Sequence, residues 1–499
     1  MNEVNMNATG FDSKKYTELQ TKAILDRMAK FGGKLYLEVG GKIFDDMHAS
    51  RILPGFLPDN KIRMLSTMKD KLEAIVCVNC QDIQKSKERG DLGITYDIEC
   101  LRMIEQYQSW GIKTGTVVLT MYAGQPEADI FRKVLQERGI KSYLHYPIHG
   151  YPENIDLIVS ENGYGKNEYV ETTAPVVLVT APGPGSGKLA VSLSQVYQDN
   201  MKGIRSGYAK FETFPVWNLP LYHPVNLAYE AATVDLEDIN LIDPFHLAAH
   251  GITAVNYNRD VETFPVLKAL FEKMLGESPY QSPTDMGVNH VGFCICNEDV
   301  VNEASKREIV RRYYRTHVEK LSGKVGDKAV SRMDTIMKQA NVSPDDFPLY
   351  KTVRDAAAEY SKAIAGIELE DGTIVLGKRS KDLTAVSAAI LNALKYIAKI
   401  HKEKDIVLPE IIKPIQDMRT QILGFENTML RADEMMLALS ISASKDLLAK
   451  KALDQIGFLK GCDIHCSVTQ YPQDISILRK LGLNLTCEPI LQTKLMFGH

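Results

Sequence analysis

Pro175-Val-Val-Leu-Val-Thr-Ala-Pro-Gly-Pro-Gly-Ser-Gly-Lys188-Leu-Ala-Val-Ser192 joins an apolar run to a helical stretch through a glycine-rich turn. The run before the turn is short, β-branched and apolar, which is typical of a strand buried on both faces of a sheet. The pattern of the stretch that begins at Lys188 predicts a helix. This segment therefore predicts one strand-turn-helix unit of an α/β protein.

Similar apolar runs recur on both sides of this unit and alternate with helical stretches. A helical pattern over Phe11–Phe31 ends at two glycines, and another over Glu127–Glu137 ends at Gly139. The predicted strands are Leu35–Val39, Ala74–Val78, Thr116–Met121, Ser142–Tyr146, Asp156–Ser160, Pro175–Thr180, Ser206–Phe211 and Ile252–Asn256. Because crossover helices cover both faces of a parallel sheet, this alternation predicts a doubly wound, mostly parallel sheet.

The chain of 499 residues exceeds the size that one hydrophobic core supports, so several domains are expected. We divide it into an N-terminal α/β domain with the glycine-rich turn (1–297), a helical connector (298–365) and a smaller C-terminal α/β domain (366–499). A β-hairpin is predicted around Asp371-Gly372. The elements predicted after it are helices at Thr384–His401, Met435–Ile456 and Asp474–Leu481, and strands at Asp463–Val468 and Leu485–Glu488.

Composition and charge exclude several classes of protein. The 59 basic and 63 acidic side chains give a formal charge of −4, so no broad basic face for a nucleic acid is expected. Neither a signal peptide nor a run of apolar residues long enough to cross a membrane is present, which predicts a cytoplasmic protein without a membrane partner. The eight cysteines are expected to be reduced, buried thiols.

The glycine-rich turn has the pattern of a phosphate-binding loop. Its glycines allow backbone N–H groups to converge, and the following helix N-terminus and the Lys188 ammonium add positive charge. Two positions depart from the usual motif, since Pro182 replaces the first glycine and Leu189 replaces the hydroxyl residue that binds Mg²⁺. The predicted ligand-binding residues are Gly183, Gly185, Ser186, Gly187 and Lys188. The alternative is a tight turn in which glycine only permits close packing.

Further polar residues follow predicted strands or lie in nearby loops, where ligands of open α/β sheets bind. These candidates are Lys42, Tyr122, Gly124, Gln125, Lys210, Glu212, Thr213, Asp235, Asp238 and Asp243. They are hypotheses about which side chains complete a site; Asp235, Asp238 and Asp243 could bind a metal or orient a hydroxyl, but acidic residues in loops are more often solvated caps.

Histidine and cysteine pairs were weighed as metal ligands. His246 and His250 are four residues apart and share a face if helical, with Asp243 one turn earlier, but the H-E-x-x-H motif of zinc proteases is absent. A packing role at a helix end is the alternative for this pair. Weaker candidates are His145 with His149, Cys77 with Cys80, Cys294 with Cys296, and Cys462 with His465 and Cys466. We assign no metal ligand and no catalytic residue from the sequence.

Three stretches resemble a bacterial family known as domain of unknown function 1846. They are Lys34–Asp46, Ala181–Lys188 and Leu481–Pro489, and the resemblance covers nearly the whole chain. It implies an N-terminal α/β region, a helical region and a C-terminal α/β region. Some members carry the label of ATP-dependent zinc protease, which the absence of H-E-x-x-H argues against here. The C-terminal region is also similar to cytidine deaminases, but Thr384-Ala-Val-Ser stands where the zinc ligand and glutamate are needed.

The sequence favours a protein that binds a nucleotide such as ATP, or a phosphorylated metabolite, at a degenerate phosphate loop, with phosphotransfer as one outcome. Two alternatives stay open. One is a non-enzymatic assembly or regulatory protein whose glycine loop is structural, and the other is a metal-dependent hydrolase that uses His246 and His250. We expect a homo-oligomer, and the sequence does not decide whether the protein is an enzyme.

Overall fold

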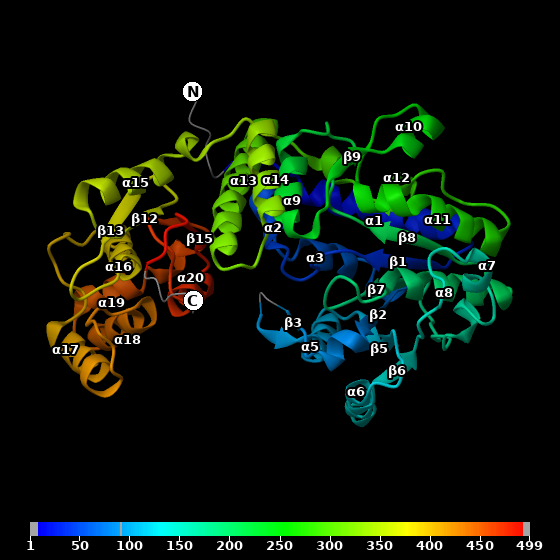
Figure 1. The fold of residues 1–499 in the computed structure, drawn as a ribbon, viewed down its shortest axis with the longest axis horizontal. Helices are drawn as coiled ribbons and strands as arrows, with labels where there is room; N and C mark the ends of the chain where they lie inside the picture. The colour runs from blue at the N-terminus through cyan, green and yellow to red at the C-terminus, as the bar shows by residue number, and fades with distance from the viewer. Residues whose placement is uncertain (1–7, 90–91, 493–499) are drawn as a thin grey trace. The chain divides into compact units, whose positions relative to one another are not determined.

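The computed structural model describes residues 8–89 and 92–492 and divides into two compact units. The N-terminal unit comprises Met1–Glu230 and Asp238–Ser305, and the C-terminal unit comprises Ala231–Glu237 and Lys306–His499. Each unit has its own sheet, seen in Figure 1. The chain is thus an α/β protein with more than one folding unit.

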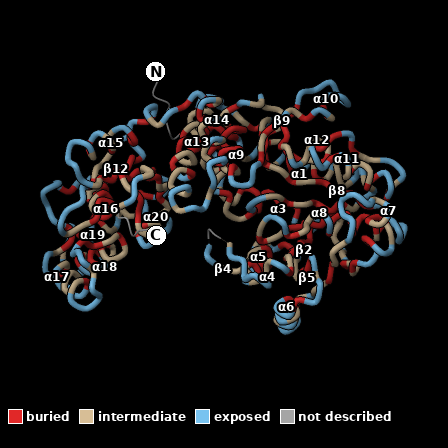
Figure 2. The backbone as a smooth tube through the Cα atoms, in the orientation of Figure 1, coloured by how far each residue is buried: buried red, intermediate tan, exposed pale blue. Residues whose placement is uncertain are grey.

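A seven-stranded parallel sheet forms the centre of the N-terminal unit, with the order β11-β8-β1-β7-β2-β5-β6. Its strands are β1 (Leu35–Val39), β2 (Leu72–Asn79), β5 (Lys113–Thr120), β6 (Lys141–Leu144), β7 (Val176–Thr180), β8 (Gly207–Phe211) and β11 (Gly287–Val288). The buried tube segments of Figure 2 include these central strands. The predicted parallel sheet is confirmed.

Helices cover both faces of this sheet, and the central strands β7 and β2 are accordingly buried over almost their whole length. In β2, Val76 and Val78 pack into one hydrophobic cluster, whereas Ile75 and Cys77 pack into another on the opposite face. The first cluster receives side chains from α1 (Ser13–Lys30), α3 (Asn60–Ser66), α5 (Tyr96–Ser109) and α6 (Pro126–Glu137). The second receives them from α8 (Lys188–Met201) and α11 (Asn258–Leu275). The sheet is therefore doubly wound.

The direction in which the chain leaves the sheet changes between β1 and β7, which are neighbours in the sheet. The chain leaves β1 through α2 (Met47–Ile52) toward α3, on the face of the first cluster. It leaves β7 directly into α8, on the opposite face. In open α/β sheets, ligands bind outside the carboxyl ends of strands at such a switch point. The glycine-rich loop lies at this position.

Smaller elements surround the sheet of the N-terminal unit. There are two short antiparallel pairs of strands. One is formed by β9 (Asn240–Ile242) and β10 (Val255–Tyr257), and the other by β3 (Glu88–Arg89) and β4 (Ile94–Thr95). The strand predicted at Asp156–Ser160 is wrong, because Ile155–Ile158 form the helical turn α7. The remaining helices are α4 (Cys80–Gln84), α7 (Ile155–Ile158), α9 (Pro224–Ala232), α10 (Pro244–His250) and α12 (Pro283–Met286).

The physical reason for α7 is a cap. The Asn154 side chain accepts a hydrogen bond from the Leu157 backbone N–H at 3.0 Å, which stabilises a helical start at this point. An apolar run this short does not by itself distinguish a strand from a buried helical turn.

The C-terminal unit has a four-stranded sheet of order β13-β12-β14-β15. The predicted hairpin is confirmed by the antiparallel β12 (Ile364–Glu368) and β13 (Ile374–Lys378), joined through Gly372 with a φ of 80°. β14 (Asp463–Cys466) pairs with β12 antiparallel and with β15 (Asn484–Cys487) parallel. Its helices are α14 (Asp327–Gln339), α15 (Pro348–Tyr360), α16 (Ala385–Ile397), α17 (Pro409–Asp417), α18 (Ala432–Ala443), α19 (Leu447–Leu453) and α20 (Pro472–Lys480).

Two helical predictions change in detail. The charged tract after residue 297 consists of α14 and a longer helix, α13 (Glu298–Leu321), which begins in the N-terminal unit and continues in the C-terminal unit. The single helix predicted over Met435–Ile456 is wrong, because α18 ends at Ala443 and α19 begins after Asp446. The Asp446 side chain accepts from the Ala449 N–H at 2.8 Å and so caps a new helix.

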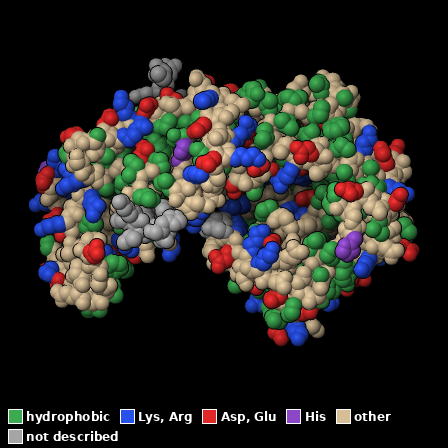
Figure 3. All heavy atoms as spheres, in the orientation of Figure 1, with side chains coloured by type: hydrophobic (Ala, Val, Ile, Leu, Met, Phe, Trp, Pro, Cys, Tyr) green, Lys and Arg blue, Asp and Glu red, His purple; other side chains and the backbone are tan. Residues whose placement is uncertain are grey.

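The surface carries both signs of charge. On the face drawn in Figure 3, lysines and arginines are interspersed with aspartates and glutamates. Across the described ranges, each helix is either too short or too polar to cross a lipid bilayer.

Candidate functional site

The glycine-rich loop connects the carboxyl end of β7 to the first turn of α8. Gly185 and Gly187 have φ angles of 74° and 80°, in the left-handed region that side chains with a Cβ rarely adopt. Gly187 is also the N-cap residue of α8 and offers no side chain to the helix end. The local sequence therefore dictates this bend, since only glycine adopts it without strain.

The carbonyl groups of the loop are held by neighbouring residues. The Gly183 oxygen accepts a hydrogen bond from Ser186 Oγ at 3.0 Å, and the Gly185 oxygen accepts one from Asn79 Nδ2 at 3.1 Å. The Ser186 oxygen accepts from Thr120 Oγ1 at 2.9 Å. Asn79 and Thr120 end β2 and β5, so two neighbouring strand ends fix the orientation of the loop.

Unlike the carbonyl groups, most backbone N–H groups of the loop lack a hydrogen-bond partner among the described residues. Within the described residues, the N–H groups of Gly183 and of residues 185–190 have no hydrogen-bond acceptor. Three of them belong to the first turn of α8, where unpaired N–H groups and the helix dipole favour a negative guest. The loop thus turns its acceptors toward the protein and leaves its donors without a partner.

Lys188 supplies the positive charge of this loop. Its side chain is half-buried, and across the described part of the chain it forms no ion pair. Its charge acts on the Cys77 thiol in β2, whose pKa is raised by burial and pulled the other way by Lys188. Lys188 is therefore an available cation beside the loop. The Ser186 hydroxyl, in contrast, is fully buried and already used within the loop.

Tyr96 closes one side of the loop. A Cβ added to Gly183 would lie 2.2 Å from the Tyr96 hydroxyl oxygen, so a side chain at position 183 is excluded unless Tyr96 moves. Tyr96 itself is buried at the start of α5. The close approach explains the glycine at this position without a ligand, in contrast to Gly185, around which an added Cβ meets nothing within 4 Å.

The loop after β1 lies beside the glycine-rich loop. Gly41 has a φ of 70°, and Lys61 Nζ is 3.8 Å from the position that a Cβ would take there. Lys61 is buried and forms an ion pair with Asp46 at 2.6 Å. Although burial opposes it, this pairing holds the pKa of Asp46 below its usual value. Lys42, the sequence candidate in this loop, is exposed.

Lys210, another sequence candidate, lies near the end of β8 and is already neutralised. Its ammonium contacts the carboxylate of Asp260 and the hydroxyl of Tyr257, and it lies 2.9 Å from Glu212 Oε1. Burial alone would lower the pKa of Lys210, but Asp260 and Glu212 raise it. Burial raises the pKa of Glu212 to about 7 against the opposing effect of Lys210. This cluster is an internal ion-pair network.

The remaining loop candidates have local roles. Gln125 accepts from the Ala123 N–H and donates to the Met121 oxygen, so it fixes the turn that also contains Gly124. Tyr122 donates to Asp129 at 2.8 Å, and Asp238 pairs with Arg259 at 2.9 Å. Thr213 is buried, Asp235 belongs to the C-terminal unit, and Asp243 caps α10.

The cysteines are free thiols, and seven of the eight are buried, with Cys296 exposed. His465 is buried and contacts Thr486 Oγ1 at 3.0 Å and Glu488 at 3.3 Å. His145 is buried with its Nε2 at 3.1 Å from the Glu168 oxygen, whereas His149 is exposed. In the described ranges none of these residues belongs to a group of metal-ligand type.

The deaminase-like segment also has a structural explanation. Thr384 is the N-cap of α16 and accepts from the Ser387 N–H at 3.2 Å. Ser387 Oγ in turn donates to the Leu430 oxygen at 3.1 Å. Both side chains are buried and are used for capping and packing.

His246 and His250 do share one face of α10, with ring centroids 4.6 Å apart. The carboxylate beside them is Asp285, which the sequence reasoning missed, and not Asp243. Burial lowers the pKa of His246, and Asp285 acts in the opposite direction. Asp285 lies 35 residues after His250, so no local spacing signals the contact.

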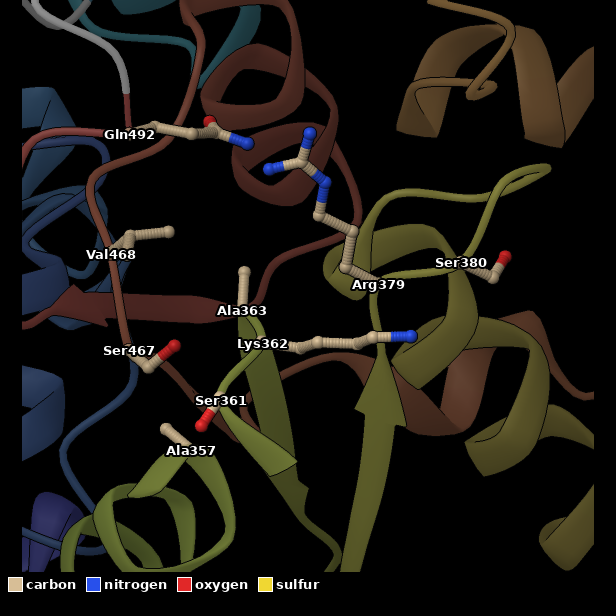
Figure 4. Close-up of a pocket in the computed structure, with 9 residues that line it drawn as sticks. All are labelled: Ala357, Ser361, Lys362, Ala363, Arg379, Ser380, Ser467, Val468 and Gln492. Atoms are coloured by element: carbon tan, nitrogen blue, oxygen red, sulfur yellow. The ribbon is translucent and has the colours of Figure 1, made fainter. Parts of the chain in front are cut away.

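The C-terminal unit has a cavity of about 450 Å³ between the end of α15 and the strands β12 and β13. Figure 4 shows its two cations, Lys362 and Arg379. The Arg379 side chain extends toward Gln492, whereas Lys362 extends in a different direction. Because the two charges do not converge on one point, this cavity is the weaker candidate for an anion.

Comparison with known proteins finds two family models along this chain, which meet between residues 341 and 345 rather than at the boundary between the two compact units. Residues 9–341 match the domain of unknown function DUF1846, N-terminal, and residues 345–497 match its C-terminal counterpart. A UPF0371 protein of Streptococcus pneumoniae (strain Hungary19A-6) is 50% identical over 487 residues, which is 98% of this chain and 99% of the relative. A UPF0371 protein of Streptococcus sanguinis (strain SK36) has the same identity and coverage. This chain therefore belongs to the DUF1846 family.

Proposed function

We propose that the N-terminal unit binds a phosphorylated small molecule, a nucleotide such as ATP or a phosphometabolite, at the loop between β7 and α8. One observation carries the proposal. The loop binds its carbonyl oxygens to Ser186, Asn79 and Thr120 and leaves a row of amide donors unpaired. Converging N–H groups at a helix N-terminus are the common protein device for phosphate.

Two further features support the same ligand class. The loop lies at the carboxyl edge of the sheet, next to the switch point between β1 and β7, where ligands of this fold class bind. Lys188 brings a positive charge that no acidic side chain of the described residues neutralises. An anionic group at the loop satisfies both the amides and the ammonium.

The chemistry of this site differs from that of ordinary phosphate-loop enzymes. Leu189 has no hydroxyl for Mg²⁺, and the Ser186 hydroxyl donates within the loop. Phosphotransfer by the usual magnesium arrangement therefore lacks its metal ligand. Binding of the phosphorylated ligand is the proposed function, and any transfer step needs a metal held by the ligand itself or by other residues.

The test is a thermal unfolding experiment with ATP, ADP and inorganic phosphate. A ligand at 100 times its dissociation constant stabilises the folded state by about 2.7 kcal/mol. We expect at least one of these ligands to raise the melting temperature of the wild type and Lys188→Ala to lose that increase. Lys133→Ala, which removes an exposed lysine of α6, is the matched control and should keep it.

Two results would contradict the proposal. One is a wild-type melting temperature that none of the three ligands changes. The other is an equal increase in wild type and Lys188→Ala, because the ligand then binds somewhere other than this loop.

A further inference from the structure

His246, His250 and Asp285 form a compact group of metal-ligand type in the N-terminal unit, on α10 and α12 (Figure 1). His250 Nε2 lies 3.0 Å from each carboxylate oxygen of Asp285, and His246 Nδ1 lies 3.5 Å from Asp285 Oδ1. One ligand atom from each residue lies within 4.8 Å of the other two.

These separations suit a shared metal ion. Ligand atoms at 2.0–2.1 Å from a tetrahedral zinc ion lie roughly 3.3 Å from one another. Two imidazoles and one carboxylate form the three-ligand set of zinc sites that keep one position open for water or substrate. Imidazole nitrogen also selects zinc and its transition-metal neighbours over Mg²⁺ or Ca²⁺.

The protein holds this group in place by buried hydrogen bonds. Ser282 is fully buried, and its Oγ lies 2.9 Å from His246 Nδ1, the same nitrogen that faces Asp285, so a metal bound through Nδ1 replaces this hydrogen bond. Asp243, also fully buried, accepts from two N–H groups of α10 through Oδ1 and from the Thr284 N–H and hydroxyl through Oδ2. Asp243 therefore ties α10 to α12. Asp243 thereby fixes the positions of the two helices that carry His246, His250 and Asp285.

The group opens into a cavity of about 390 Å³ whose wall is also cationic. Arg27 and Lys30 of α1 line this cavity together with Trp217. Arg27 Nη2 donates to the Gly287 oxygen at 3.4 Å, but Arg27 Nη1 is buried and has no partner among the described residues. The guanidinium also lies over the Tyr280 ring, 5.5 Å from its centre, so its charge is held at the cavity wall. An anionic guest is attracted by that charge and provides an acceptor for Nη1 once the side chain turns toward it.

We propose that His246, His250 and Asp285 bind one divalent transition-metal ion of the zinc type, and that Arg27 binds a carboxylate or phosphate group of a ligand held at its open position. The residues lie near β11 at the edge of the sheet, away from the β7–α8 loop. The metal site is thus independent of the proposed phosphate loop. In this site the histidine pair has a metal-binding role, with Asp285 as the third ligand.

The experiment is a Co²⁺ titration of the full chain after chelator treatment, followed by visible absorption. Every protein carries Cys296→Ser, because the exposed thiol is a competing ligand. We expect one equivalent of Co²⁺ to bind with the absorption of a low-coordinate site, and Zn²⁺ to displace it. His250→Ala and Asp285→Asn should each weaken binding at least about tenfold.

His149→Ala is the matched control, since it removes an exposed histidine outside the group, and it should bind Co²⁺ as before. His250 is partly exposed, so His250→Ala should retain the melting temperature of the metal-free protein. Absence of stoichiometric Co²⁺ binding would overturn the proposal. Binding of equal strength in the wild type and in both ligand variants would overturn it as well.

Arg27 is tested on the Co²⁺-loaded protein with inorganic phosphate as the anion. We expect phosphate to change the Co²⁺ absorption spectrum of the wild type, and to do so at concentrations at least about tenfold higher in Arg27→Gln. An identical phosphate response in the two proteins would exclude Arg27 from the site.

Discussion

Acidification should destabilise the N-terminal unit through His145, which lies just after β6. The imidazole is buried, its Nε2–H donates to the Glu168 oxygen at 3.1 Å, and its Nδ1 has no partner among the described residues. Burial disfavours the charged ring and lowers the pKa of His145 from 6.5 to about 4. One unit of pKa difference between the folded and unfolded states corresponds to about 1.4 kcal/mol of unfolding free energy. Protonation of His145 therefore lowers the unfolding free energy by about 3 kcal/mol.

The sign follows from proton binding. Between pH 6.5 and about 4 the unfolded chain binds a proton at His145 that the folded unit does not, so stability falls as the pH falls through this window. Above pH 6.5 the ring is neutral in both states, and below about pH 4 it is charged in both. The loss of about 3 kcal/mol is therefore confined to that interval.

Urea unfolding followed by tryptophan fluorescence measures this effect, because both tryptophans, Trp110 and Trp217, lie in the N-terminal unit. Other groups titrate in the same range, so the quantity to measure is the stability difference between wild type and His145→Gln. This difference should shrink by about 3 kcal/mol between neutral pH and pH 4. The exposed His149→Gln serves as control. A difference that stays constant with pH would refute the reasoning.

Three further predictions concern the glycine-rich loop, the link that Asp243 makes between α10 and α12, and the assembly of the chain. Gly185→Ala should lower the unfolding free energy by about 1 kcal/mol, because position 185 has a positive φ. Gly183→Ala should lower it by about 1–3 kcal/mol, because Tyr96 must move. Equal stability of the two variants in urea would contradict this prediction. Asp243→Ala removes four hydrogen bonds and should lower the unfolding free energy by about 2–4 kcal/mol in the same assay; a loss under about 0.5 kcal/mol would contradict its role. Light scattering of the full chain should give a multiple of 55.8 kDa, and a monomer mass would end the expectation of a homo-oligomer.

Local signals in the sequence suffice for the elements that carry the candidate loop. The apolar run of β7, the glycines at 185 and 187 and the start of α8 follow one another without interruption. The hairpin around Asp371-Gly372 is equally local, since a turn needing positive φ lies between two β-rich runs. In both cases the deciding interaction joins residues only a few positions apart.

Contacts between residues far apart in the chain could not be predicted from the sequence. Asn79 and Thr120 reach the loop from strands 106 and 66 residues away from their carbonyl acceptors, and Asp285 meets His250 across 35 residues. Lys210 looked available in the sequence, but Asp260 neutralises it.

Sequence by itself determined the parallel, doubly wound sheet and the bend at the glycine-rich loop, because periodicity and backbone conformation depend on near neighbours. Only the tertiary structure decided which polar side chains are paired with other residues. Lys210 is paired with Asp260, whereas Lys188 forms no ion pair among the described residues. The physical reason is that strand order and helix crossover set these pairings, and the free energy that selects them comes from burial distributed over the whole unit.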